Sequence, residues 1–205
     1  MLEVLAAAVA VGIVLGLATG GRLRWVASAR LRGLPLLVTG AAAEAAVGSE
    51  AFALHGWQAT VLLLGGYACL AAFAAANLGR PGMGVILAGI ALNAIPIAVN
   101  SGMPVEASAI VRARIATAQD VPLLDFGTKR HLAGAGDHLR LLDDRFPDWV
   151  THRVLSLGDL VIGVGVGAVT AGLLHPTTGR RRRRLRHARP RRHFTGEVAA
   201  GAAVV

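Results

Sequence analysis

Long apolar runs separated by short polar segments dominate the chain. Five runs stand out, at residues 2–19, 34–54, 57–77, 83–100 and 154–174. The second is apolar chiefly over residues 34–47, so the extension to 54 is needed to bring it to full length. Because a helix needs about 20 apolar residues to cross the hydrocarbon core of a bilayer, the pattern predicts five membrane-spanning helices.

Two segments fall outside these runs. Residues 101–153 mix polar, charged and small residues and form one long loop, in which residues 105–118 alternate in a way that favours an amphipathic helix on the membrane surface. Residues 176–205 are basic and predict a disordered tail. The predicted fold is all-α: an integral membrane bundle of about five transmembrane helices in residues 1–175, with one long extracytoplasmic loop.

Composition agrees with this picture. Of the 205 residues, 54% are hydrophobic and only 16% are charged, and the mean hydropathy is +0.57. Soluble domains carry about 25% charged residues, so an ordinary soluble domain is excluded. A single cysteine allows no intrachain disulfide. The net charge of +9 comes mostly from arginines beside the apolar runs, with little aromatic interleaving, so we expect no nucleic-acid partner.

The positions of the basic residues predict an orientation. Four arginines follow the first run, Arg80 follows the third, and nine arginines lie in the tail. The segment 101–153 has seven basic and seven acidic residues. Because cytoplasmic loops carry the excess of Lys and Arg, we expect a multi-pass protein of the inner cell membrane with its N-terminus outside and its tail in the cytoplasm. In the tail, Arg180, Arg181, Arg182, Arg183 and Arg184 are expected to contact anionic lipid headgroups.

Small residues predict how the spans pack, because close approach drives helix association in lipid. Two faces have small residues at four-residue spacing: Ala8, Gly12, Gly16 and Gly20 in the first span, and Gly163, Gly167 and Ala171 in the last. Asp159 lies one turn before the second face and is expected to point into the bundle. A compact bundle follows, and a spare small-residue face would also suit a homodimer.

The polar residues in or near the spans are the first candidates for a site, since burying them in a membrane is costly. They are Glu44, Asn93, Asn100, Ser156 and Asp159. Each has a structural interpretation as well. Ser156 and Asp159 have the spacing of a capping box at a helix start, and Glu44 suits a packed or snorkelling position more than a catalytic one.

Asn93 and Asn100 are two turns apart on one helical face, with Pro96 between them. Proline removes one backbone hydrogen bond and kinks a helix, so Asn93 is expected to help solvate the freed backbone. Gly102 is expected in the left-handed position that ends the helix. The alternative is that this helix end binds a cation or a polar headgroup, and Asn100 and Asp159 are expected to meet there.

The loop over residues 127–149 is rich in side chains that could bind a metal or act as acids and bases, namely His131, Asp137, His138, Asp143 and Asp144. Their spacing matches neither a zinc nor a calcium pattern. A solvated loop with local ion pairs to Arg130, Arg140 and Arg145 is favoured, and no metal or cofactor is expected. No nucleotide-binding loop, nucleophile elbow or metalloprotease motif occurs in the sequence.

The order of these motifs resembles a family of small multi-pass bacterial membrane proteins, mainly actinobacterial, that is classified only as a domain of unknown function. The resemblance covers roughly residues 1–175 and is carried by N-x(6)-N-x-G-M-P, by a loop with Lys-Arg-His, and by S-x-G-D before the last span. The matching residues are Asn93, Asn100, Gly102, Met103, Pro104, His131, Leu142, Asp144, Pro147, Ser156, Gly158 and Asp159. It implies a membrane location and a five-span architecture, but no reaction.

The sequence therefore favours a membrane protein without an assignable reaction, with a polar cluster at the outer membrane surface. Two alternatives stay open. One is an enzyme acting on a lipid or isoprenoid phosphate, with His131 as base and Asp144 or Asp159 orienting it or holding a metal. The other is a small permease, or a permease subunit, with Glu44, Asn93 and Asp159 lining a polar path.

Overall fold

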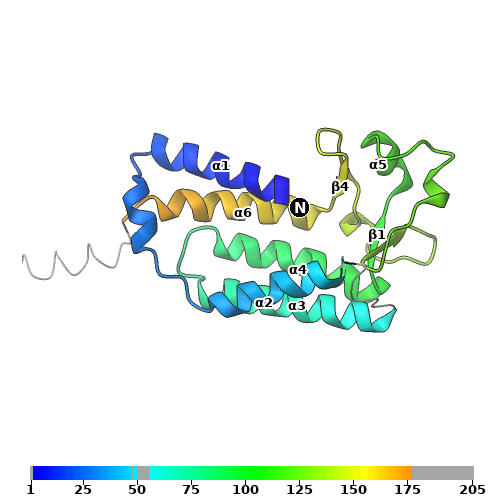
Figure 1. Ribbon diagram of the computed structural model, residues 1–205, viewed down its shortest axis with the longest axis horizontal. Coiled ribbons are helices and arrows are strands. Elements are labelled where there is room, and N and C mark those ends of the chain that lie inside the picture. The colour runs from blue at the N-terminus through cyan, green and yellow to red at the C-terminus, as the bar shows by residue number, and fades with distance from the viewer. Residues whose placement is uncertain (1, 48, 50–55, 177–205) are drawn as a thin grey trace, which may run out of the picture. The chain divides into compact units, whose positions relative to one another are not determined.

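The computed structural model describes residues 2–47, 49 and 56–176, and its helices follow the apolar runs (Figure 1). The prediction of a mostly helical chain is confirmed. Five helices of 14 to 20 residues form the main body of the described chain: α1 (Leu2–Ala18), α2 (Leu34–Val47), α3 (Trp57–Ala76), α4 (Met83–Asn100) and α6 (Leu157–Leu173). The arginines of the predicted tail, at 180–192, lie outside the described residues.

Two of these helices, α3 and α4, are long and apolar enough to cross a membrane. The other three have 14 to 17 residues, which is short for a bilayer core about 30 Å thick. Length and hydropathy thus give weak support for a membrane protein, and the five-span bundle stays a prediction.

Two predicted spans have different bounds in the structure. Helix α2 ends at Val47, and Ser49 is not helical, while most of the predicted extension to 54 lies outside the described residues. The last span was predicted from residue 154, but Val154 and Leu155 belong to a strand and the helix begins at Leu157. Ser156 separates the two elements because its side chain caps the helix.

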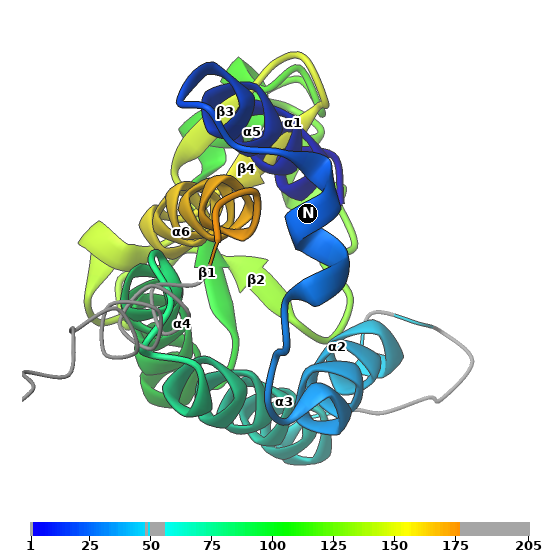
Figure 2. The ribbon, with the colours of Figure 1, turned by 90° about the vertical axis from the view of Figure 1, so that its left-hand side faces the viewer.

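The helices lie side by side in a series that differs from their order in the sequence. Helix α2 packs against α3, α3 against α4, α4 against α6, and α6 against α1. Viewed along the helices, the series forms an open arc (Figure 2). Its two ends, α1 and α2, are joined by a connection that contains the short helix η1 (Leu23–Ser28).

The two predicted small-residue faces pack against each other. A Cβ added to Gly12 would lie 2.5 Å from the carbonyl oxygen of Gly167, and one added to Gly16 would lie 3.1 Å from Cα of Ala171. Side chains larger than hydrogen would hold these backbones apart. The middles of the two predicted faces therefore form one interface, whereas at the ends a Cβ on Gly20 would have no neighbour within 4 Å among the described residues and one on Gly163 would meet only Val4, at 4.0 Å.

A second glycine interface, which was not predicted from the sequence, joins α4 to α6. Gly82 and Gly89 are seven residues apart in the chain, as are Gly158 and Gly165. A Cβ on Gly82 would meet the carbonyl oxygen of Gly165 at 2.5 Å, and one on Gly89 would meet that of Gly158 at 2.8 Å. Seven-residue spacing keeps one helix face against its neighbour, so α6 has glycine interfaces on two sides.

The segment 101–156, here called the cap, is folded and lies at one end of the helices (Figure 1). Strand β1 (Met103–Val105) pairs in parallel with β2 (Arg130–Leu132), and β3 (Phe146–Asp148) pairs antiparallel with β4 (Arg153–Leu155). Three short helices, α5 (Ala107–Arg112), η3 (Val121–Leu123) and η4 (Arg140–Leu142), connect them.

The cap has its own hydrophobic core. Val105, Ile110, Val121 and Val154 are each at most 3% exposed and pack together. Within residues 127–149, which were predicted to form a solvated loop, most residues are exposed or half-buried, and Asp143 and Asp144 are the buried exceptions. The predicted amphipathic helix at 105–118 is wrong in extent. Helix α5 has six residues, and its apolar face packs into the cap core because the strands on either side supply apolar partners.

Alanine substitutions at two nearby glycines of α6 test the α4–α6 interface. Gly165→Ala should destabilise the protein by about 1–3 kcal/mol, because its Cβ would lie 2.6 Å from Cγ1 of Ile86 and 2.8 Å from that residue's backbone nitrogen. Gly163→Ala is the matched control, since its Cβ would meet only Val4, at 4.0 Å. Thermal unfolding of the detergent-purified variants measures the difference, and equal midpoints would contradict the interface.

Candidate functional site

Asn93, Ser156 and Asp159 form a buried hydrogen-bonded cluster where the cap meets the helices. The amide nitrogen of Asn93 donates to Oδ1 of Asp159 at 2.8 Å, and the hydroxyl of Ser156 donates to Oδ1 of Asn93 at 2.7 Å. The three side chains are at most 4% exposed. The cluster connects the middle of α4 to the first turn of α6.

The predicted capping box at the start of α6 is confirmed. The backbone N–H of Asp159 donates to Oγ of Ser156 at 3.0 Å, and the N–H of Ser156 donates to Oδ2 of Asp159 at 3.3 Å. The negative carboxylate also lies in the first helical turn, where the helix dipole stabilises it. Each carboxylate oxygen of Asp159 therefore accepts a hydrogen bond, which offsets part of the cost of burying the group.

Gly158 permits this arrangement. A Cβ at residue 158 would overlap the side-chain amide of Asn93 and would lie 2.7 Å from the carbonyl oxygen of Gly89. Glycine is thus required at this position by the approach of a neighbouring side chain, and its own backbone conformation is helical. From the sequence, Asn93 was expected to help solvate the backbone freed by Pro96, but no hydrogen bond of this kind is found among the described residues. The amide instead bonds to Asp159 of α6 and to Ser156, the residue that caps this helix.

Glu44 lies outside the cluster. It is half-buried on α2, and no hydrogen bond or ion pair in the described part of the chain joins it to Asn93 or Asp159. Tyr67, buried on α3, forms a side-chain hydrogen bond with Asn93. Glu44 instead influences the cap: burial lowers the pKa of Lys129, and the Glu44 carboxylate partly offsets this shift.

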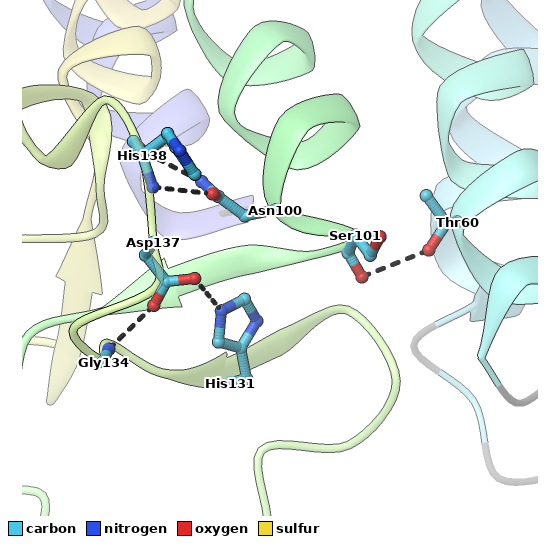
Figure 3. Close-up of polar contacts among 7 residues, drawn as sticks. All are labelled: Thr60, Asn100, Ser101, His131, Gly134, Asp137 and His138. Carbon is cyan, nitrogen blue, oxygen red and sulfur yellow. Dashed lines mark hydrogen bonds and ion pairs between the residues drawn. The ribbon is translucent and has the colours of Figure 1, made fainter.

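Asn100 does not meet Asp159, contrary to expectation. Its side chain pairs with the backbone of His138, accepting from the N–H at 2.8 Å and donating to the carbonyl at 3.0 Å (Figure 3). The left-handed residue that ends α4 is Ser101, with φ of 58°, and Gly102 follows with φ of 154°. Asn100 therefore fastens the end of α4 to the cap.

Asn77 makes a similar clamp at the opposite end of the helices. Its side chain accepts from the backbone N–H of Arg32 at 2.9 Å and donates to the carbonyl of the same residue at 2.8 Å. It follows directly after α3, as Asn100 ends α4. An amide suits this role because it offers one acceptor and two donors that match a backbone peptide.

His131 forms a dyad with Asp137, and not with Asp144 or Asp159 as the enzyme interpretation required. Nε2 of the imidazole lies 2.9 Å from Oδ1 of Asp137, whose Oδ2 accepts from the N–H of Gly134 at 2.7 Å (Figure 3). Burial acts to raise the pKa of Asp137, but the hydrogen bonds from Gly134 and His131 hold it below its ordinary value. A charged carboxylate thus orients a half-exposed imidazole, whose side chain is 37% exposed.

Asp143 and Asp144 are the buried acids of the cap. Arg130 lies 2.8 Å from Oδ2 of Asp144, so one of the predicted ion pairs is confirmed. Burial nevertheless raises the pKa of Asp144 to about 7, and it also raises the pKa of Asp143. Both oxygens of Asp143 are buried without a hydrogen-bond partner in the described part of the chain.

Nothing in the sequence predicted that Asp143 and Asp144 would be buried. The Asp144 N–H donates to the carbonyl of Pro104 at 3.0 Å, and its carbonyl accepts from Glu106 at 2.9 Å. These bonds place residue 144 beside β1, where the cap core covers it. Within the described residues, no group of three or more His, Cys, Asp or Glu side chains could hold a metal ion.

Comparison with known proteins identifies the family. The chain belongs to a family of unknown function, DUF5317, whose sequence model matches residues 28–170. The match includes α2, α3, α4, the cap and most of α6, and it leaves α1 outside. Neither a curated protein nor a solved structure shows significant similarity to the chain.

A pair of serine substitutions tests the cluster. Ser156→Ala removes both the helix cap and the hydrogen bond to Asn93, leaving the Asn93 oxygen buried and unpaired, so it should destabilise the protein by about 2–3 kcal/mol. Ser108→Ala makes the same chemical change at an exposed position of the cap and should shift stability by less than about 0.5 kcal/mol. Denaturation of both variants in detergent measures the difference, and similar values would refute the role of the cluster.

The raised pKa of Asp144 predicts that folding depends on pH. The ordinary pKa is 3.8 and the folded value is about 7, so the folded protein binds the proton more tightly than the unfolded chain. Stability is then lost as pH rises from about 4 to about 7, and the loss is complete above that range. The wild type should have a higher melting temperature at pH 5 than at pH 8, and Asp144→Asn should reduce this difference. If the melting temperatures of Asp144→Asn at pH 5 and pH 8 differ as much as those of the wild type, Asp144 is not the group responsible.

Proposed function

We propose that this DUF5317 protein is an integral membrane protein that crosses the bilayer five times and holds a rigid cap at the outer surface, where it acts as a non-catalytic binding module. The observation that carries the proposal is the closed cluster of Asn93, Ser156 and Asp159. It joins the strand that ends the cap to two helices, so the cap has a fixed position on them.

Several features support insertion in a membrane. Two helices have the length and hydropathy of a span. The helices also expose large apolar side chains, such as Val14 at 65%, Val38 at 66% and Val164 at 68%. Exposed valines on three separate helices are costly in water but are the ordinary surface of a protein in lipid.

The geometry of the cluster favours a structural role over catalysis or transport. Each carboxylate oxygen of Asp159 already accepts a hydrogen bond, and the Asn93 amide uses both of its ends. A group that takes up a substrate or an ion must be accessible to it, whereas Asn93, Ser156 and Asp159 are each at most 4% exposed. Because Glu44 lies outside this network, the three groups of the permease interpretation do not form one bonded path.

A membrane enzyme is the second candidate, and the His131–Asp137 dyad is the observation that favours it. With Nε2–H donating to the carboxylate, the other ring nitrogen, Nδ1, carries a free lone pair and is able to act as a general base. Nδ1 faces Gly102, where a Cβ would lie only 3.2 Å away. The dyad lies in the cap, at the membrane surface on this interpretation.

Cysteine labelling tests the membrane topology. In a Cys69→Ser background, we expect an impermeant maleimide to label Leu123→Cys in intact cells, because this cap residue is 82% exposed. Ser28→Cys, exposed at the opposite end of the helices, should be labelled only after the membrane is permeabilised. The protein should also stay in the membrane fraction after extraction with alkaline carbonate.

Each alternative outcome has a distinct meaning. Release by carbonate would overturn the membrane proposal itself. Labelling of both cysteines in intact cells would contradict the three spans, α2, α3 and α4, between the two positions, and labelling of Ser28→Cys alone would reverse the orientation.

Histidine substitutions distinguish the enzyme from the binding module. If purified protein hydrolyses any member of a panel of lipid phosphates, His131→Gln should abolish the reaction and Asp137→Asn should shift its pH profile. His138→Gln is the matched control, because His138 contributes its backbone to the Asn100 clamp. If His131→Gln still turns over substrate, the His131–Asp137 dyad is excluded as the catalytic base. Absence of turnover in the wild type favours the binding module.

A further inference from the structure

Five arginines form a surface, here called the arginine face, at the end of the helices away from the cap. Arg22, Arg24, Arg30 and Arg32 lie between α1 and α2, and Arg80 lies in the turn between α3 and α4. The first four are exposed and Arg80 is half-buried. The family and the proposed binding role of the cap assign no function to them.

Hydrogen bonds hold this face in place. The N–H of Arg22 donates to the carbonyl of Leu174 at 2.7 Å, which ties the segment to the end of α6. The Asn77 clamp fixes Arg32, and the guanidinium of Arg80 donates to the carbonyl of Arg30 at 2.6 Å. The fold therefore sets the backbone positions of Arg22, Arg30 and Arg32 and the position of the Arg80 guanidinium.

Among the described residues at this end, 19–33, 77–82 and 172–175, no Asp or Glu balances the arginine face. The four ion pairs found among the described residues all involve residues of the cap. Like charges gathered on one surface repel each other unless an anion lies among them, so the face is complementary to a negatively charged partner.

Apolar side chains lie directly beside these charges. In η1, Leu23 is 61% exposed and Val26 is 43% exposed, and their spacing places them on one side of a helix with three residues per turn. The guanidinium of Arg24 lies 5.3 Å from the centre of the Trp25 ring. A segment with exposed apolar residues, an aromatic ring and arginines is suited to the boundary between headgroups and acyl chains.

We propose that the arginine face binds the headgroups of anionic phospholipids, with Leu23 and Val26 among the first acyl carbons and the guanidinium groups on the phosphates. Arginine suits this contact because its planar donors pair with two phosphate oxygens at once. The inference rests on the proposed membrane insertion, and it assigns the lipid contact to described residues of the helical unit, separately from the arginines of the tail.

Quenching of Trp25 fluorescence tests the proposal in the full-length protein. Trp57→Phe and Trp149→Phe leave Trp25 as the reporter; the two replaced residues are 74% and 62% exposed. Phosphatidylglycerol with brominated acyl chains is titrated into protein in neutral detergent, with brominated phosphatidylcholine as the neutral comparison. Phosphatidylglycerol should quench at a lower lipid fraction than phosphatidylcholine, and high salt should reduce the difference.

The matched variants remove equal charge from the two ends. Arg22→Gln with Arg30→Gln should weaken the preference for phosphatidylglycerol by about fivefold for each arginine removed, and the backbone bonds of both residues stay intact. Arg112→Gln with Arg114→Gln, at exposed positions of the cap, should leave it unchanged. The tail is present in both proteins, so its contribution cancels.

Equal quenching by the two lipids would overturn the proposal, as would an equal preference for phosphatidylglycerol in the two double variants. The proposal would also fail if inorganic phosphate displaced the brominated phosphatidylglycerol more strongly than chloride does at the same ionic strength. The last result would indicate a site for free phosphate. A protein that resists carbonate extraction but fails this test retains the proposed membrane insertion and loses only the lipid assignment.

Discussion

The close approach of α4 and α6 is the contact on which the rest of the structure depends. Glycines on both helices let their backbones meet, and at Gly158 this approach leaves room for the amide of Asn93. The amide then reaches Asp159, so that a buried carboxylate gains a donor where water is excluded. Hydrogen bonds are strongest, and their loss is most costly, in such an environment. The glycines and the polar cluster thus depend on each other.

The position of the cap depends on this contact between α4 and α6. Strand β4 leads through Ser156 into α6, so the residue that ends the cap is also part of the cluster. A second attachment comes from Asn100, which binds the backbone of His138, and a third from Thr128, whose hydroxyl donates to the carbonyl of Val47 at 2.6 Å. Attachments on α2, α4 and α6 restrain the cap in more than one direction, which suits a module that presents a fixed surface.

Charge is separated along the helices. Every Asp and Glu of the described chain belongs to the cap, to its neighbour Glu3, or to the two helical positions Glu44 and Asp159. Glu3 lies 3.1 Å from Arg153 of the cap, so the start of α1 is at the same end. In the described part of the chain, the opposite end has arginines and no Asp or Glu. Charged residues of both signs thus lie at one end of the apolar helices, and arginines lie at the other. This distribution of charge is the one expected of a protein oriented in a bilayer.

The sequence by itself determined the local features. The apolar runs located the helices, the four-residue spacing of small residues marked one packing face on α1 and one on α6, and Ser156 with Asp159 specified a capping box, because each depends on neighbours within a few turns of one segment. Tertiary structure alone decided that Asn93 binds a residue 66 positions away, that Asn100 binds the cap, and that Asp143 and Asp144 are buried. The physical reason is that these contacts depend on which helices and strands become neighbours, here α4 with α6 and β1 with β2, and no periodicity within one segment encodes that choice.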